Sequence, residues 1–250
     1  MKAIIIAAGS GQRLNSEKTK LPKGLLNING KTIIQRQINL LKNNNIQDIT
    51  ILTGPHKEKF NFSNVHYVED LEYEKHDVLG SFMAARSIIN DDILTSYSDI
   101  IFEEKILKSM TEFTGDIGIA VDLDWEKNYD GRDQHPKSEA ENVLFDKEGN
   151  ILEIRKNIVE YKENEKIGEC LGLMKFSRNA SKIFLDKYSE LEKSHKGKFH
   201  NAPSLEKALI SDMLQELIVS GIRVSPIYVS GKWCEIDTPQ DLQKARKLFS

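Results

Sequence analysis

The first thirty residues constrain the fold of this chain more than any other stretch. Residues 3–8 form an unbroken apolar run, and glycines follow at positions 9 and 11. A short apolar run closed by glycines is typical of a strand that is buried on both faces of a parallel sheet. Glycine also lets backbone N–H groups approach an anion closely, and Arg13 and Lys23 add two positive charges nearby. The stretch therefore predicts a triphosphate-binding loop that consists of Ala7, Ala8, Gly9, Ser10 and Gly11, with Arg13 and Lys23 beside it.

Two other interpretations of this stretch are weaker. The dinucleotide fingerprint G-x-G-x-x-G needs its third glycine for close packing of helix against strand. Here Leu14 stands at that position, and the loop continues through polar residues as far as Lys20. An ordinary glycine turn after a strand would leave the positions of Arg13 and Lys23 unexplained.

The rest of the chain alternates between strand and helix patterns. Apolar runs closed by turn residues predict strands over residues 49–53, 66–68, 93–97, 117–121, 171–176 and 222–229, and a hairpin over residues 142–145 and 151–154. Apolar positions at helical spacing predict helices over residues 32–45, 80–89, 103–114, 180–191 and 204–220, and a last helix with Thr238 as its N-cap and Pro239 at its first position. This alternation predicts an α/β fold, with a Rossmann-like, mostly parallel central sheet and helices on both faces. We expect one domain over residues 1–250, with a small substrate-facing β insertion at about residues 122–176.

The N-terminal residues also carry a resemblance to a known family. The run Ala7-Ala8-Gly9-Ser10-Gly11-Gln12-Arg13, followed by Leu21-Pro22-Lys23, resembles the signature of the sugar-phosphate nucleotidyltransferase superfamily. The resemblance implies a sheet of the nucleotidyltransferase type, with Arg13 and Lys23 as catalytic residues that hold the triphosphate of the incoming nucleotide. The usual lysine-proline-lysine appears here with Leu21 at its first position, so only the proline-lysine pair is kept. The same resemblance implies that Ser81 lines the nucleotide or acceptor pocket.

Carboxylates at strand ends are the candidates for a metal site. Nucleotidyl transfer requires that the charge of a triphosphate be neutralised, and Mg²⁺ prefers carboxylate and phosphate oxygens. Asp99 directly follows the strand expected at residues 93–97, and Asp237 stands just before the last helix. Aspartates in these places also serve as turn residues or as acids at a helix N-terminus. In this order, however, Asp99 and Asp237 resemble the metal-binding pair of the superfamily, and Glu235 would lie on the same side of a strand as Asp237, next to substrate.

Four residues in the middle of the chain are candidates for contacts with the acceptor. Lys156 follows the predicted hairpin and is a candidate catalytic cation that neutralises a phosphate. Arg132 and His135 suit the binding of a phosphate or phosphonate, arginine through its bidentate fork. Glu139 suits contact with an ammonium group. For each of them a solvated surface position is an open alternative, and for Glu139 it is the stronger one.

Further segments narrow the resemblance to one subgroup. Residues 97–100, 135–141, 154–156, 172–176 and 231–237 look like the cytidylyltransferases of phosphocholine and related phosphate or phosphonate esters, some of which are associated with phosphoenolpyruvate mutase. The resemblance implies CTP as the donor, a small phosphate or phosphonate acceptor such as phosphocholine or 2-aminoethylphosphonate, and release of pyrophosphate. Two alternatives remain: a sugar-1-phosphate nucleotidyltransferase that uses UTP, dTTP or GTP, and a catalytically silent regulator that binds nucleotide.

Composition excludes several other classes of protein. With 38 acidic and 35 basic residues, the net charge of −3 gives no electrostatic case for a nucleic-acid or membrane partner. No apolar run approaches the roughly 20 residues of a membrane span. The only cysteines, Cys170 and Cys234, fit a cytoplasmic protein with reduced thiols. No nucleophile motif supports covalent catalysis, and homo-oligomerisation is left open.

Overall fold

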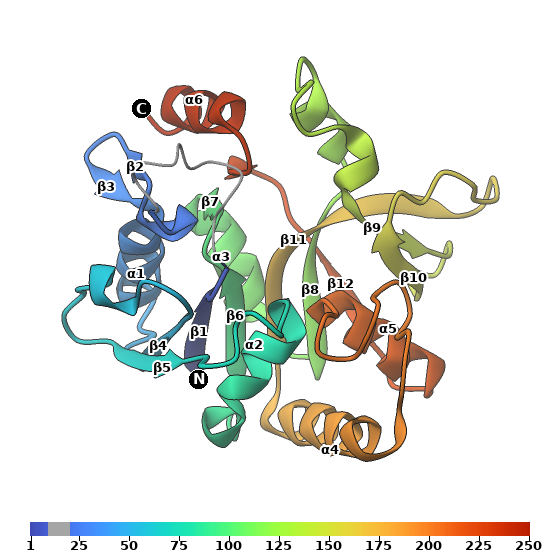
Figure 1. The fold of residues 1–250 in the computed structure, drawn as a ribbon. Helices are drawn as coiled ribbons and strands as arrows, with labels where there is room; N and C mark the ends of the chain where they lie inside the picture. Colours follow the sequence, from blue (N-terminus) through green and yellow to red (C-terminus); the bar gives the residue numbers. More distant parts are fainter. Residues whose placement is uncertain (10–20) are drawn as a thin grey trace.

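The computed structural model describes residues 1–9 and 21–250 (Figure 1). Within these residues the helices are α1 Ile33–Asn43, α2 Val78–Ala84, α3 Glu104–Glu112, α4 Arg178–Ser194, α5 Ile210–Val219 and α6 Pro239–Leu248. The strands are β1 Lys2–Ala7, β2 Asn27–Ile28, β3 Lys31–Thr32, β4 Ile49–Thr53, β5 His66–Glu69, β6 Ile93–Tyr97, β7 Ile100–Phe102, β8 Ile117–Asp122, β9 Glu141–Phe145, β10 Ile151–Lys156, β11 Lys166–Phe176, β12 Ser225–Tyr228 and β13 Trp233–Glu235.

One sheet of nine strands organises the described part of the chain. Its main path runs β10-β9-β11-β6-β1-β4-β5, and β8 joins β11 to β12. The strands β6, β1, β4 and β5 are parallel to their neighbours in this group. The long strand β11 then pairs antiparallel with β6, β8 and β9. This arrangement confirms the predicted α/β fold with a mostly parallel central sheet.

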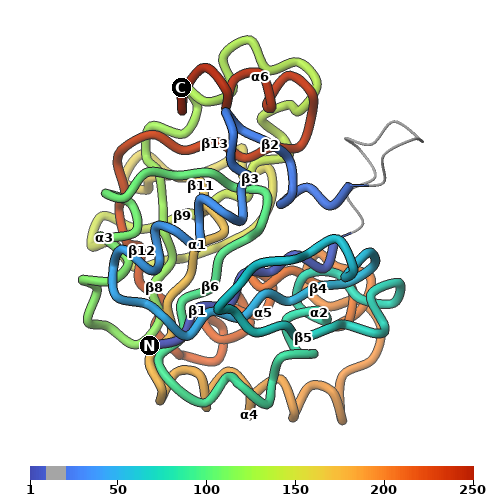
Figure 2. The backbone as a smooth tube through the Cα atoms, turned by 90° about the vertical axis from the view of Figure 1, so that its left-hand side faces the viewer, coloured from blue at the N-terminus to red at the C-terminus, as the bar shows by residue number. Residues whose placement is uncertain are grey.

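The two faces of β1 explain why its sequence is apolar from Ala3 to Ala7. Successive side chains of a strand point to opposite faces. Ile4 and Ile6 pack into a cluster with residues of α2, α4 and α5, whereas Ala3 and Ile5 pack into a second cluster with residues of α1 and α3. Figure 2 shows these two groups of helices on opposite sides of the sheet. Burial on both faces leaves no position from Ala3 to Ala7 at which a polar side chain would reach water, whereas Lys2 at the start of β1 is partly exposed.

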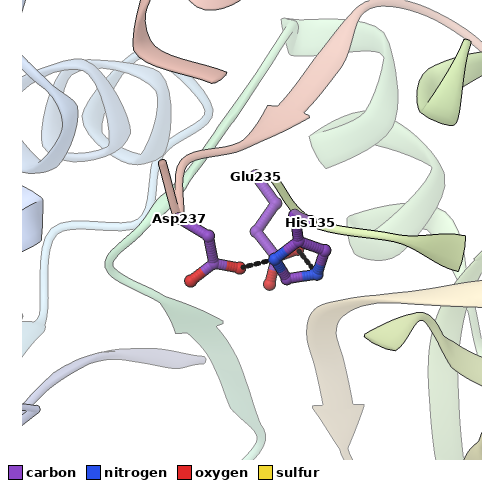
Figure 3. A group of neighbouring side chains, drawn as sticks. All are labelled: His135, Glu235 and Asp237. Carbon is purple, nitrogen blue, oxygen red and sulfur yellow. Dashed lines mark ion pairs between the residues drawn. The ribbon is translucent and has the colours of Figure 1, made fainter. Parts of the chain in front are cut away.

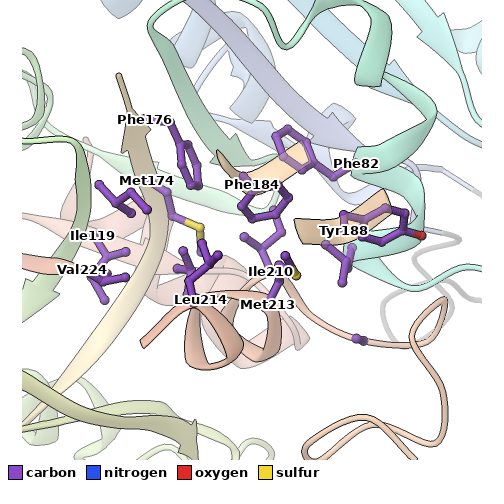
Figure 4. Close-up of a cluster of buried hydrophobic side chains, with 14 of the residues drawn as sticks. Phe82, Ile119, Met174, Phe176, Phe184, Tyr188, Ile210, Met213, Leu214 and Val224 are labelled. Carbon is purple, nitrogen blue, oxygen red and sulfur yellow. The ribbon is translucent and has the colours of Figure 1, made fainter. Parts of the chain in front are cut away.

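Aromatic rings join the helices of one face to the sheet. Phe184 of α4 lies edge-on to Phe82 of α2 and to Phe176 of β11, with ring centroids 5.8 and 5.4 Å apart (Figure 4). Edge-to-face pairs at this spacing are favourable beyond the area that they bury. They connect α2, which carries Ser81, through α4 to strand β11.

Several predicted elements have other limits. The helix expected over residues 204–220 begins only at Ile210, because the carboxylate of Asp212 accepts a hydrogen bond from the backbone N–H of Leu209 at 2.9 Å and so caps the helix there. The helix expected over residues 80–89 is α2, which begins after its N-cap Asp77 and gives way to a short 3-10 turn. Strand β11 starts five residues before the predicted residue 171.

Other predictions agree with the structure. The strands at residues 49–53 and 93–97 have the predicted bounds, and β9 and β10 form the predicted antiparallel hairpin. The last helix has Thr238 as its N-cap and Pro239 at its first position. No helix in the described ranges combines the length and the apolar character that a bilayer crossing requires.

Candidate active site

A cavity of about 1110 Å³ opens beyond the carboxyl ends of the parallel strands. Ligands bind at this edge in open α/β sheets. Gly9, which follows β1, and Ser98 and Asp99, which follow β6, line the same cavity. So do Ala7, Ala8, Lys23, Ser81, His135, Glu139, Lys156, Glu235 and Asp237. The predicted binding residues Ser10, Gly11 and Arg13 lie outside the described residues.

Lys23 lies between the two aspartates that were predicted to bind metal. Its ammonium donates to Asp99 Oδ2 at 3.0 Å and also to Asp237 Oδ1. Burial alone lowers the pKa of Lys23, but the attraction and hydrogen bonds of the two carboxylates outweigh it, so the pKa is raised. Lys23 is therefore a permanent cation among the residues that line the cavity.

Pairing between two short strands brings Asp99 and Asp237 together. Strand β7 follows Asp99 and pairs antiparallel with β13, which ends at Glu235. Just beyond this pairing, the backbone N–H of Ile236 donates to the carbonyl of Asp99 at 2.9 Å. Asp237 is then held by the start of α6, where its backbone N–H donates to Asp241 Oδ2 at 3.1 Å.

His135 and Glu235 complete a polar group around Asp237 (Figure 3). His135 Nδ1 lies 3.1 Å from Asp237 Oδ2, and its Nε2 lies 4.0 Å from Glu235 Oε2. Burial, followed by the neighbouring Arg132 charge, lowers the pKa of His135. Burial raises the pKa of Glu235 well above its ordinary value, and the nearby Asp237 and Asp99 add to this effect. Three carboxylates thus crowd one small volume.

The donor set fits a divalent cation. One ligand atom from each of His135, Glu235 and Asp237 lies within 4.8 Å of the others. Carboxylate oxygens are the ligands that Mg²⁺ prefers. The Lys23 ammonium already bridges Asp99 and Asp237, which shows that these two carboxylates can share one positive charge. The residues that are present therefore suit the Mg²⁺ that the sequence implied.

Arg132 does not lie where the predicted contact with a phosphate or phosphonate requires it. Its Nε donates to Asp241 Oδ1 at 2.6 Å, and its guanidinium lies 5.0 Å from the centre of the Tyr129 ring. Its side chain is only 7% exposed, and it is not one of the residues that line the described cavity. The structure thus places Arg132 as a support for the N-terminus of α6, which carries Asp237, and not as a direct phosphate contact.

Lys156 and Glu139 meet at the rim of the cavity. Lys156 ends β10, and its ammonium donates to Glu139 Oε2 at 3.0 Å. Both side chains are nearly half exposed, so this ion pair is weak and easily rearranged when a ligand binds. Ser81, by contrast, is buried on α2, and its hydroxyl donates to Asp70 Oδ2 at 2.8 Å.

Comparison with known proteins identifies the family. The model of the MobA-like NTP transferase domain matches residues 3–136, which is more than half of the chain. This chain is a member of the MobA-like NTP transferase family. It is a nucleotidyltransferase, and the resemblance of its N-terminal signature is confirmed.

Relatives of this nucleotidyltransferase include two curated cytidylyltransferases. The CTP:phosphoglutamine cytidylyltransferase of Campylobacter jejuni is 27% identical over 254 residues, which cover 97% of this chain and 98% of the relative. The choline-phosphate cytidylyltransferase of Streptococcus pneumoniae is 32% identical over 119 residues, or 46% of this chain and 52% of the relative. The solved structure of the CTP:phosphocholine cytidylyltransferase from Streptococcus pneumoniae has a TM-score of 0.74 at 20% identity, covering 100% of this chain and 99% of that one. At this identity the likeness shows the fold alone.

Sequence reasoning missed two buried carboxylates: Glu169, which lines the nucleotidyltransferase cavity, and Asp70, which contacts the lining residues Ser81 and His76. Asp70 is buried directly after β5, the same kind of position that singled out Asp99 after β6. Glu169 lies within the apolar strand β11, and it accepts a hydrogen bond from the Tyr129 hydroxyl. A lone carboxylate inside an apolar strand was the available signal, since such a group is buried only at a cost unless it is paired.

Proposed function

We propose that this nucleotidyltransferase is a Mg²⁺-dependent cytidylyltransferase that transfers CMP from CTP to a small phosphate or phosphonate acceptor. The observation that carries the proposal is the position of Lys23 between Asp99 and Asp237, all three of which line the cavity. A fixed cation beside two carboxylates suits a reaction whose main demand is the neutralisation of phosphate charge.

Sheet order divides the cavity into two arms. Strand β5 is the outermost strand on one side of β1, and β10 is the outermost strand on the other side of β6. The arm beside β4, β5 and α2 is lined by residues such as His56, His76 and Ser81, all within the matched domain of residues 3–136. The arm beside β9 to β11 is lined by residues beyond that match, including Lys156 and Glu169. We assign the nucleoside to the first arm and the acceptor to the second.

The proposed chemistry is an in-line displacement at the α-phosphorus of CTP. An oxygen of the acceptor's phosphate or phosphonate forms a new bond to this phosphorus, and the bond from phosphorus to the β-phosphate oxygen breaks, releasing pyrophosphate. The attacking oxygen is already anionic, so no general base is needed. Lys23 holds phosphate oxygens and balances their charge, while Lys156 attracts the acceptor's anionic group.

Asp99 and Asp237 would hold the Mg²⁺, with Glu235 and His135 beside them. When bound there, the ion supplies positive charge at the phosphate oxygens, where negative charge accumulates during the transfer. The chain's own contribution is positioning: β7 and β13 fix the two aspartates relative to each other, and Arg132 and Asp241 fix the segment that carries Asp237.

Two observations support CTP as the donor and a small molecule as the acceptor. The relative from Campylobacter jejuni is named a CTP:phosphoglutamine cytidylyltransferase, and it aligns over 97% of this chain. In addition, the acceptor arm offers the cation Lys156 together with the carboxyl groups of Glu139 and Glu169. That mixture suits a small molecule with an anionic phosphate or phosphonate at one end and a hydrogen-bond donor at the other.

A pyrophosphate-release screen tests the proposal. The purified protein is incubated with Mg²⁺, with each of CTP, UTP, ATP, GTP and dTTP, and with a panel that contains phosphocholine, 2-aminoethylphosphonate, phosphorylated amides and sugar 1-phosphates. We expect release with CTP and one small phosphate or phosphonate acceptor, and none when EDTA replaces Mg²⁺. Release with UTP or dTTP and a sugar 1-phosphate would overturn the donor and acceptor assignments.

A further inference from the structure

One buried carboxylate controls two side chains of the nucleoside arm. Asp70 is 2% exposed and follows β5, where its backbone N–H donates to the carbonyl of Thr53 at 2.8 Å. Its Oδ2 accepts the Ser81 hydroxyl at 2.8 Å, and both of its oxygens lie 3.0 Å from His76 Nδ1. Its Oδ1 also accepts the backbone N–H of Glu72 at 3.0 Å. Three donors therefore converge on this one carboxylate.

This arrangement fixes what Ser81 can offer to a ligand. An ionised carboxylate only accepts hydrogen bonds, and a hydroxyl has a single hydrogen. Because Ser81 donates that hydrogen to Asp70, it presents only lone pairs to the cavity that it lines. Within residues 1–9 and 21–250, no protein group donates to this hydroxyl, so its lone pairs are left for a ligand.

The same argument applies to His76, which also lines the cavity. In the neutral imidazole one ring nitrogen is a donor and the other an acceptor, and the contact of one nitrogen selects the tautomer. A proton on Nδ1 is the one that Asp70 can accept, which leaves Nε2 as an acceptor. With His76 neutral, both side chains thus present acceptors because of one carboxylate.

We propose that Asp70 is a specificity-determining residue. By accepting hydrogen bonds from Ser81 and His76, it makes the nucleoside arm select cytosine over uracil. Cytosine carries an exocyclic amino group, a donor, where a uracil or thymine ring carries a carbonyl, an acceptor. A pocket that presents acceptors pairs with the amino group and leaves the carbonyl unpaired, which is the costly outcome in a buried site. The inference rests on the proposed assignment of this arm to the nucleoside.

The change Asp70→Asn should reverse this polarity. Its amide keeps an oxygen for the Glu72 N–H and turns its NH₂ group toward Ser81. The Ser81 hydroxyl then accepts a hydrogen bond and its own hydrogen is free to point into the cavity, where it suits uracil. Ser81→Ala removes the group altogether and provides a second variant that does not depend on how the buried amide settles.

Nucleotide binding alone tests the inference, without knowledge of the acceptor. CTP and UTP are titrated separately, with MgCl₂ present, into the wild-type protein, Asp70→Asn and Ser81→Ala, and dissociation constants are measured by calorimetry. We expect the wild type to bind CTP at least tenfold more tightly than UTP, and Asp70→Asn to reduce this ratio at least tenfold. Ser81→Ala should reduce the ratio by a smaller factor. Asp212→Asn makes the same change at a buried carboxylate that caps α5, and it should keep the wild-type ratio.

The outcomes separate this inference from the proposed function. If the wild type prefers CTP and folded Asp70→Asn or Ser81→Ala retains the full preference, the role of Asp70 is refuted while the cytidylyltransferase assignment stands. If the wild type does not prefer CTP over UTP, both are refuted. A loss of CTP preference in both variants, with affinity for UTP retained or improved, supports the inference. If the role of Asp70 were purely structural, its replacement would weaken the binding of both nucleotides together.

Discussion

At the scale of single residues, the charge balance of the site depends on Lys23. Asp99, Asp237 and Glu235 bring three carboxyl groups into one small volume, and crowding with burial raises the pKa of Glu235. Lys23 is the cation that lies between two of them. A triphosphate that enters this volume brings further negative charge, so the site depends on this lysine as well as on a metal ion.

Replacement of Lys23 should therefore abolish most activity. We expect Lys23→Ala to lower turnover by at least about 10² to 10³-fold, the usual range for loss of one charge-stabilising donor. The fold should be kept, because Lys23 belongs to a short 3-10 turn and not to the core. Pyrophosphate release measures the effect, circular dichroism checks the fold, and Lys42→Ala, which removes a lysine of α1 outside the cavity, is the control. A folded Lys23→Ala protein with wild-type turnover would contradict the assignment.

The second residue-scale prediction concerns Glu169, a buried group that should make stability depend on pH. Burial raises its pKa from about 4.5 to about 8. Between these values the native state keeps a proton that the unfolded state has lost, so the free energy of unfolding falls as the pH rises from about 4.5 to about 8. Glu169→Gln cannot ionise, and we expect it to be more stable than the wild type at pH 8 by on the order of 2 kcal/mol.

Urea unfolding of both proteins at pH 5, 6.5 and 8 measures this difference. Many groups contribute to the pH dependence, so the informative quantity is the difference between the wild type and Glu169→Gln at each pH. That difference should grow with pH. Glu153→Gln, at a more exposed position on β10, controls for the loss of one surface charge. A difference that stays constant from pH 5 to pH 8 would show that Glu169 does not hold a proton in the native state.

At the scale of elements, the N-terminus of α6 connects helix capping to the metal site. Asp241 accepts hydrogen bonds from the Thr238 backbone and hydroxyl, both at 2.8 Å, and from the backbone N–H of Asp237 at 3.1 Å. Its Oδ1 also accepts a hydrogen bond from Nε of the buried Arg132 at 2.6 Å. One carboxylate thus caps the helix, orients Asp237 and compensates a buried charge.

Removal of Asp241 should be costlier than the loss of an ordinary cap. We expect Asp241→Ala to lower the free energy of unfolding by about 3 to 5 kcal/mol, because it leaves the Arg132 charge without its main partner. Thr238→Ala, which removes only the cap hydroxyl, should cost about 1 kcal/mol. Chemical denaturation of the two variants gives the comparison. Equal losses would mean that Asp241 acts as a cap alone.

At the scale of the whole molecule, β11 ties the two arms of the cavity together. It pairs with β6 of the parallel half and with β8 and β9 of the other half, so both halves share the nine-stranded sheet. The single domain predicted over residues 1–250 implies that the chain unfolds as one unit. We expect calorimetry to show one transition, whose midpoint rises when CTP and Mg²⁺ are added, because a ligand that binds only the native state stabilises it.

Two separate transitions would contradict the single-domain prediction. A single transition that CTP and Mg²⁺ do not shift would leave the domain prediction intact but contradict the nucleotide site. UTP with Mg²⁺ under the same conditions is the control, and it should raise the midpoint less than CTP does.

The sequence alone determined the elements that are buried on both faces or that begin with a strong local signal. Residues 49–53 and 93–97 are such strands, because apolar and β-branched residues dominate them and a turn residue follows each. Thr238 and Pro239 mark the start of α6 through local capping chemistry. Likewise, the sequence offered candidate cations and carboxylates for the site, because phosphate chemistry restricts the residue types that can serve.

Only the tertiary structure decided which of these residues meet. The pairing of β7 with β13 joins Asp99 to the segment before Asp237, and no local pattern encodes a contact between residues so distant in sequence. Arg132 was expected to face a phosphate, but its side chain donates a hydrogen bond to Asp241 instead. Which partner Arg132 finds depends on where α6 packs. Local chemistry thus sets the type of each group, whereas its partner is set by long-range packing.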